Sequence, residues 1–235
     1  MVKIGLIGEN PNDTESVKNL LSRYYNGTVT YNSILKNLPG SLLDNKKFLL
    51  DRIYEEGYKD YCIIIAIRDL IDETESNTPI RELRRRRLRW FNELNRNIEN
   101  KAIFLLNINE LEVLFIADIR NSNHFYKTNI VVEENPTEIL DPKGYLIQKT
   151  YLEKEDNNSE CTSIYSVSDA KKLCEGVDIN VLKQNLDYFN EFIEIFEQRL
   201  EECKKNLKET SHNKKGKSSS KSLLNSSKKS RKKSS

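Results

Sequence analysis

Residues 61–67 read YCIIIAI, and this stretch decides the fold. It is apolar throughout, so a strand formed here needs other elements to cover both of its faces. Strands of this kind lie in the middle of parallel sheets. The segment therefore predicts a central strand in a parallel sheet.

Strand and helix patterns alternate on both sides of this segment. Further strands are predicted at residues 2–8 and 102–108, where aliphatic residues follow one another, and a possible strand at residues 28–35. Apolar residues at helical spacing predict helices after a cap at Asn12 or Asp13 and at residues 42–58 and 79–95. Alternation of this kind predicts an α/β fold, in which a doubly wound, mainly parallel sheet of about four strands carries helices on both faces.

The chain becomes mostly helical after the last predicted strand. Helical patterns cover residues 110–119, 142–151 and 181–207, and we expect these helices to pack against the sheet. Residues 1–203 are therefore expected to form one domain.

The formal net charge of +2 conceals two oppositely charged parts. Residues 204–235 contain twelve Lys or Arg and one acidic residue, so they carry +11 of the total and leave −9 for residues 1–203. A basic, Ser-rich segment with few apolar residues buries too little surface to fold, which predicts a disordered tail. Such a tail either lies along a polyanion or only keeps the protein soluble.

The cysteine spacing shows no metal-binding or redox motif. No C-x-x-C pair is present, no signal sequence is legible, and no apolar run approaches the length of a membrane span. We therefore expect a cytoplasmic protein without a zinc site and with four free thiols, Cys62, Cys161, Cys174 and Cys203.

Acidic residues follow three of the predicted strands. Glu9 follows the first, Asp69 and Asp72 follow residues 61–67, and Glu110 and Glu112 follow residues 102–108. In open α/β sheets, ligands bind beyond the carboxyl ends of the strands. Magnesium prefers oxygen ligands, so carboxylates gathered at this edge predict a divalent-metal site. Taken singly, acidic residues at such positions also serve as helix caps.

Several motifs, in the same order along the chain, resemble those of Toprim domains, especially the small standalone Toprim-like proteins of the DUF4276 family. The resemblance covers about residues 2–200. Its motifs are IGLIGENPNDTESVKNLL (4–21), CIIIAIRDLID (62–72), WFNELN (90–95), FLLNINELEVLFIAD (104–118), LDPKGYL (140–146) and LCEGVDINVLKQNLDYFNEFIE (173–194).

The resemblance implies a nuclease that depends on Mg²⁺ or Mn²⁺ and hydrolyses phosphodiester bonds in DNA or RNA. Asp69 and Asp72 would hold the metal, and Glu9 would act as general base or as a second-metal ligand. Glu112 would complete a second metal site. Lys143 would place a positive charge against the transition state, or would be a solvated loop lysine.

One departure from the family pattern leaves a rival reading open. Asp69 and Asp72 are three residues apart, where the family spacing is two, and a spacing of three shares one face only if the chain has begun to turn. Glu73 is a possible substitute for Asp72. The rival is a catalytically inactive binding or regulatory module on the same scaffold.

The helix predicted at residues 79–95 carries a run of arginines. Consecutive arginines wrap around a helix, so some face solvent, while those near its start are placed to contact phosphates beside the metal. We expect Trp90 and Phe91 to be core residues. The residues predicted to contact nucleic acid are Arg68, Arg81, Arg84 and Arg85.

The resemblance also implies partners. Similar proteins are associated with ATPase subunits and with defence against mobile DNA, including phages, and this chain has no GxxxxGK[ST] motif of its own. A receiver-like switch also collects acidic residues at strand ends. It needs a Lys at a later strand end, and no Lys stands after Ile108 where one would be required. The oligomeric state is left open.

Overall fold

The computed structural model describes the backbone of residues 1–9, 11–35, 40–70, 78–156, 160–161 and 163–226. Side chains are described over the same ranges except at residues 11, 40–41 and 210–226.

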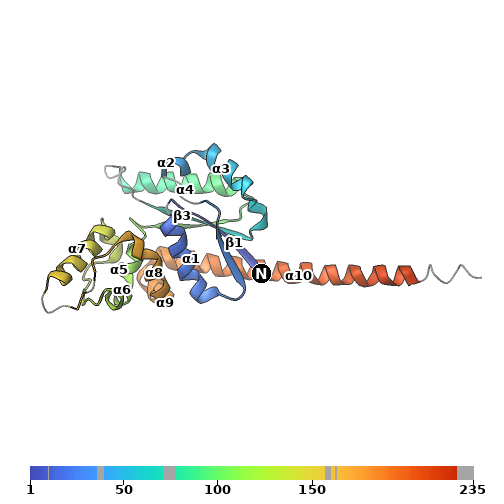
Figure 1. Ribbon diagram of the computed structural model, residues 1–235. Helices are drawn as coiled ribbons and strands as arrows, with labels where there is room; N and C mark the ends of the chain where they lie inside the picture. The colour runs from blue at the N-terminus through green and yellow to red at the C-terminus, as the bar shows by residue number, and fades with distance from the viewer. Residues whose placement is uncertain (10, 36–39, 71–77, 157–159, 162, 227–235) are drawn as a thin grey trace, which may run out of the picture.

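A four-stranded sheet forms the centre of the protein, and all of its strands are parallel (Figure 1). The strand order is β2-β1-β3-β4. The register places Ile7 beside Ala66 and Asp69 beside Asn107. The strands are β1 (Val2–Ile7), β2 (Val29–Ser33), β3 (Ile63–Asp69) and β4 (Ala102–Asn107). The α/β fold with a parallel sheet of four strands is thereby confirmed.

Helices cover both faces of the sheet, as the apolar sequence of β3 predicts. Alternate β3 residues enter two separate cores, since side chains alternate across a strand. Ile64 and Ala66 pack toward α2 (Gly40–Leu43), α3 (Lys46–Glu55) and α4 (Ile80–Asn97). Ile63, Ile65 and Ile67 pack toward α1 (Pro11–Tyr25), α8 (Ala170–Gly176) and α10 (Asp187–Ser226).

The second half of the described chain is helical. Its remaining helices are α5 (Val113–Ala117), α6 (Ile119–Tyr126), α7 (Pro142–Glu155) and α9 (Ile179–Asn185). Short 3₁₀ turns are η1 (Tyr58–Asp60), η2 (Pro136–Glu138) and η3 (Val167–Asp169). Helix α8 packs against α1, and α10 lies along β4, β1 and β3. None of the described helices is long and apolar enough to cross a membrane.

Three predicted helices are each divided in the structure. The segment 181–207 breaks at Leu186, which has φ −135° and ψ 99° and separates α9 from α10. Two further breaks have local causes. The segment 42–58 is split because Asn45 begins a new helix, where its Oδ1 accepts a hydrogen bond of 3.2 Å from the backbone N–H of Phe48. The segment 110–119 begins later and breaks at Asp118, which has φ −114° and ψ 62°. Helical periodicity continues across both breaks, so it does not reveal them.

The last helix differs from the sequence prediction of a disordered tail. Helix α10 continues from Asp187 through Ser226 and projects from the body of the protein (Figure 1). The backbone from residue 204 to residue 226 is therefore helical, where the sequence predicted disorder. This segment contains no Pro and a single Gly, and Lys is a good helix former, so the helix has no strong reason to end. Residues 227–235 lie outside the described part.

A disulfide joins Cys62, just before β3, to Cys203 of α10. The prediction of four free thiols is therefore wrong for this pair, and Cys161 and Cys174 are free. The two bonded cysteines are 141 residues apart in sequence, while their Cα atoms are 6.1 Å apart. Sequence spacing alone cannot reveal such a pair, because the packing of α10 brings it together.

Candidate metal centre

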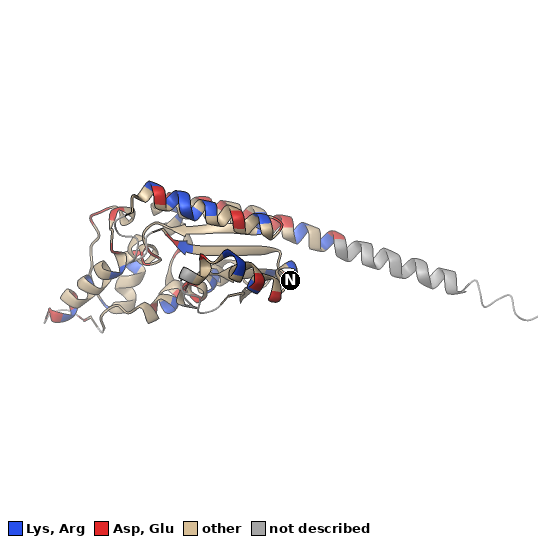
Figure 2. Ribbon diagram, turned by 90° about the horizontal axis from the view of Figure 1, so that it is seen from above, with Lys and Arg blue, Asp and Glu red and all other residues tan. Residues whose placement is uncertain are grey.

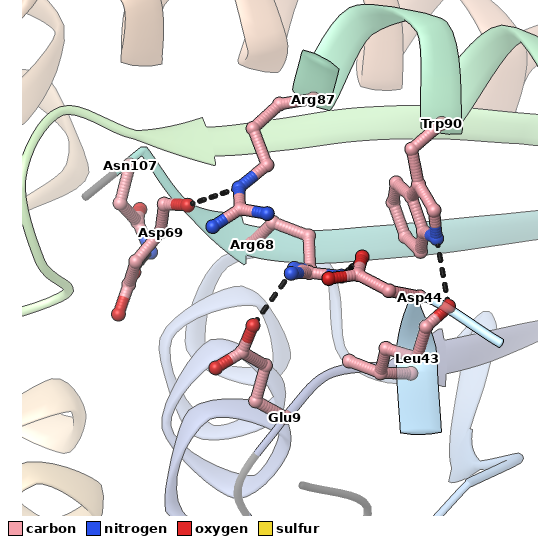
Figure 3. Close-up of polar contacts among 8 residues, drawn as sticks. All are labelled: Glu9, Leu43, Asp44, Arg68, Asp69, Arg87, Trp90 and Asn107. Atoms are coloured by element: carbon pink, nitrogen blue, oxygen red, sulfur yellow. Dashed lines mark hydrogen bonds and ion pairs between the residues drawn. The ribbon is translucent and has the colours of Figure 1, made fainter. Parts of the chain in front are cut away.

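The carboxyl ends of β1 and β3 lie side by side at a topological switch point. The chain leaves β1 for α1 on one face of the sheet and reaches α4 on the other face after β3. Open α/β sheets bind ligands at such points. Glu9 follows β1 and Asp69 ends β3, so both lie at this edge (Figure 3).

Asp69 lies among other carboxylates. One of its carboxylate oxygens, Oδ1, accepts a hydrogen bond of 2.9 Å from Nδ2 of Asn107. The pKa of Asp69 is raised well above its usual value of 3.8, mainly because its carboxyl group is removed from water. The negative charges of Asp13, Glu112 and Glu9 raise the pKa further, while the Asn107 hydrogen bond opposes them. The charges of Glu9, Asp13 and Glu112 therefore act on Asp69, and we refer to these four residues as the carboxylate cluster.

The buried guanidinium of Arg68 forms an ion pair with the carboxylate of Glu9. Its side chain has 0% exposure, and its Nε lies 2.8 Å from Oε1 of Glu9. Its Nη1 lies 3.0 Å from Oδ1 of Asp44, and its guanidinium lies 5.0 Å from the centre of the Trp90 ring (Figure 3). The predicted contact of Arg68 with nucleic acid is thereby corrected, because Arg68 points into the core that covers the α4 face and acts as a positioning residue.

A second buried arginine fixes α4 to the end of β3. The Nε of Arg87 donates a hydrogen bond of 3.1 Å to the backbone oxygen of Asp69 (Figure 3). Arg87 is only 4% exposed, although its neighbours Arg84, Arg85 and Arg86 are exposed. The middle of α4 is therefore held against the carboxyl end of β3.

Glu112 and Glu110 lie on the β4 side of the cluster. Glu112 is 7% exposed, and its Oε1 accepts a hydrogen bond of 2.8 Å from the hydroxyl of Tyr165. Oε2 of Glu110 accepts a hydrogen bond of 3.0 Å from the backbone N–H of Lys143, whose Nζ lies 3.9 Å from Oε1. Burial raises the pKa of Glu110, and the charge of Glu112 adds to this effect. Lys143 thus lies at the margin of the cluster.

The arrangement fits a hard cation in one respect and falls short in another. Oδ1 of Asn107 is buried without a hydrogen-bond partner in the described structure, and its amide is held against Asp69. Such an oxygen beside a carboxylate is a suitable cation ligand. Within the described ranges, however, no three Asp, Glu, His or Cys residues lie close enough to hold an ion together. Asp72 and Glu73 fall outside those ranges.

Sequence reasoning missed Asn107 and Asp13 as members of the site. Asn107 is the last residue of β4, but it is not acidic and the strand was predicted to run to residue 108, so the search for acidic residues after strands passed over it. Asp13 lies in the first turn of α1, where an acidic residue is also explained by helix capping. Only the packing of α1 beside β3 brings Asp13 close enough to raise the pKa of Asp69.

The other arginines predicted to contact nucleic acid are on the surface of α4, where the run of basic residues is blue in Figure 2. These are Arg81, Arg84 and Arg85. Trp90 and Phe91 pack against the core, as predicted. Phe91 stacks on Phe104 with ring centres 4.7 Å apart.

Comparison with known proteins assigns the chain to no family, so the resemblance to Toprim domains rests on the sequence motifs. No protein-family model matches the chain, and neither a curated protein nor a solved structure matches it significantly.

Proposed function

We propose that the protein is a Mg²⁺- or Mn²⁺-dependent nuclease that cleaves phosphodiester bonds in DNA or RNA. The observation that carries the proposal is the cluster of Glu9, Asp13, Asp69 and Glu112 at the switch point between β1 and β3. The charges of the other three residues raise the pKa of Asp69, and a bound divalent cation would offset that repulsion.

The residues of the cluster suit different tasks in phosphodiester cleavage. Asp69 and the buried oxygen of Asn107 are placed to hold the cation. A bound cation would neutralise charge on the phosphate and lower the pKa of a bound water. Glu9 keeps 25% of its side chain exposed and is oriented by Arg68, which suits a general base or a second-metal ligand.

Two more residues complete this assignment on the β4 side. Glu112 is fixed by the Tyr165 hydroxyl and contributes its charge to a second metal position. Lys143 is held by Glu110 and supplies a positive charge at the margin of the cluster. Its role is the electrostatic stabilisation of a phosphate oxygen in the transition state.

The proposal is tested by cleavage of labelled DNA and RNA with Mg²⁺, with Mn²⁺ and with EDTA. Asp69→Asn and Glu9→Gln should each lower the cleavage rate by about 10- to 100-fold or more. Asp60→Asn is the matched control, because Asp60 is exposed and precedes the amino end of β3. The proposal fails if the wild type shows no metal-dependent cleavage of either substrate.

The inactive binding module is the second candidate, and two contacts favour it. Glu9 is already paired with Arg68, and Glu112 already accepts the Tyr165 hydroxyl. This candidate predicts nucleic-acid binding that is unchanged by EDTA and never followed by cleavage. The partner ATPase and the role in defence against mobile DNA are proposals that rest on the same family resemblance. The cytoplasmic location is a proposal that rests on the sequence, in which no signal segment is recognised.

A further inference from the structure

An arginine stripe occupies the outward face of α4. Its members are Arg81, Arg84, Arg85, Arg89 and Arg96, and all five are exposed. They face away from Leu83, Arg87 and Leu94, which are the buried residues of this helix. At 3.6 residues per turn, the stripe covers about 140° of the helix circumference and about 22 Å of its length. With Leu88 and Asn92 it lines a shallow groove of about 500 Å³.

Among the described residues, few carboxylates pair with the charges of this stripe. Glu82 pairs with Arg85 at 2.7 Å, and Glu93 pairs with Lys46 of α3 at 3.3 Å. Three stripe residues form no ion pair or hydrogen bond with any described residue: Arg81, Arg84 and Arg89. Because residues 1–203 carry a net charge of −9, this local excess of positive charge favours a polyanionic partner.

The aromatic residues of α4 are occupied elsewhere. The indole N–H of Trp90 donates a hydrogen bond of 2.9 Å to the backbone oxygen of Leu43, and its ring lies against Arg68. The ring of Phe91 stacks on Phe104. Proteins that bind single strands stack bases on exposed aromatic rings, whereas contact with a duplex backbone needs mainly Lys and Arg. The stripe therefore suits a double helix better than a single strand.

The position and width of the stripe favour the DNA form of the double helix. Arg84 and Arg89 lie at the two edges of the arginine stripe, about 140° apart around the helix. A helix enters the major groove of B-form DNA, which is about 12 Å wide, whereas the major groove of RNA duplexes is narrow. Arg87 joins α4 to the backbone oxygen of Asp69, so the helix that carries the stripe crosses the carboxyl end of β3.

We propose that the arginine stripe docks the backbone of double-stranded DNA and guides it to the carboxylate cluster. This inference rests on the proposed nuclease function and names its substrate class. Each arginine that contacts a phosphate contributes about 0.9 to the slope of log K against log salt concentration.

The test measures binding of the full chain to a 30-base-pair DNA duplex in EDTA at several salt concentrations. The triple substitution Arg81→Gln, Arg84→Gln and Arg89→Gln should weaken binding at least about 10-fold and reduce the salt slope by about 3. The matched control replaces Arg52 and Arg199 with Gln, since both are exposed on other helices and pair with a Glu three residues away. This control should change the affinity less than 2-fold.

Three outcomes would overturn the inference: an unchanged affinity in the triple variant, an equal loss in the control, or equal or tighter binding to single-stranded DNA or duplex RNA. Binding in EDTA excludes metal-dependent cleavage, so the stripe is tested apart from catalysis. If the triple variant loses affinity while the wild type never cleaves DNA, the stripe stands and the nuclease proposal fails. Melting curves check that each variant is folded.

Discussion

Arg68 connects the end of β1 to the helices that cover the α4 face of the sheet at the candidate site. Its guanidinium contacts the carboxylates of Glu9 and Asp44 and the ring of Trp90. We expect Arg68→Met to lower the free energy of unfolding by about 2–4 kcal/mol, because the Glu9 carboxylate would lose its buried partner. Lysine should rescue only part of this loss, since it lacks the planar fork that holds two carboxylates.

Urea unfolding measures this effect, and Arg52→Met is its control. Arg52 is exposed and pairs only with Glu55 of its own helix, so its replacement should cost less than about 0.5 kcal/mol. A loss below 1 kcal/mol for Arg68→Met would show that the buried ion pairs add nothing to stability.

Asp69 should make stability depend on pH when no metal is present. Its pKa in the folded protein is raised above the usual 3.8, so the folded state favours the protonated form. This contribution to stability is complete below about pH 3.8 and is lost as the pH rises through the raised pKa of the folded state. Asp69→Asn should therefore melt at a higher temperature than the wild type at pH 7, with a difference that shrinks toward pH 4.

Thermal unfolding in EDTA between pH 4 and pH 8 checks this expectation. A stabilisation of 1 kcal/mol corresponds to about 2–4 °C in a domain of this size. Asp60→Asn, with an exposed carboxyl group, should show no such trend. A wild type that melts above Asp69→Asn at pH 7 would mean that Asp69 is stabilised in its charged form.

At the scale of elements, the disulfide between Cys62 and Cys203 ties α10 to the start of β3. A bond that closes a loop of this length should stabilise the protein by about 2–4 kcal/mol, mainly by restricting the unfolded chain. We expect Cys203→Ser to lower the urea midpoint accordingly, and a thiol reductant to lower that of the wild type.

The control for this prediction is Cys161→Ser, because Cys161 is free and partly exposed. Reductant should shift the urea midpoint of this control as much as that of the wild type, and it should leave Cys203→Ser unchanged. An unaltered midpoint for reduced wild type would contradict the prediction.

The strands could be predicted from sequence more closely than the helices. Three of the four strands, β1, β3 and β4, are short and mainly apolar runs, and β3 was expected at residues 61–67 and found at Ile63–Asp69. The divided helices were missed because capping by Asn45 and the turn at Asp118 are local events that leave the apolar spacing intact. The helical continuation of α10 was missed because composition predicts disorder more readily than it predicts an extension from a stable helix.

For the molecule as a whole, the segregation of charge leads to a test of the basic end. Residues 210–235 contain nine Lys or Arg and no acidic residue. A protein that ends at Glu209 keeps Cys203 and the packed part of α10, so its melting temperature should stay within about 2 °C of the wild type. If the basic end lies along nucleic acid, the truncated protein should bind DNA more weakly and with a smaller salt slope. An unchanged slope would leave solubility as the role of this segment.

The candidate site could be predicted in outline because parallel topology brings strand ends together. Glu9 and Asp69 are sixty residues apart, yet neighbouring strands place them at the same edge. The burial of each side chain could not be predicted. Arg68 and Asp69 are consecutive residues at the end of β3, and their side chains point to opposite faces of the sheet. The hydrogen-bond partners of Glu112 and Asn107 could not be predicted either, because they depend on the packing of Tyr165 and on the pairing of β3 with β4.

The position of α10 has a consequence for how the chain is made. All four strands are complete by Asn107, but the helix that lies along β4, β1 and β3 begins only at Asp187. At 5–20 residues per second, a ribosome needs about 4–16 s to synthesise the intervening segment. During that interval the nascent chain exposes part of an apolar sheet surface. We therefore expect chaperones to bind the chain at this stage, and we expect chains that terminate before α10 to aggregate.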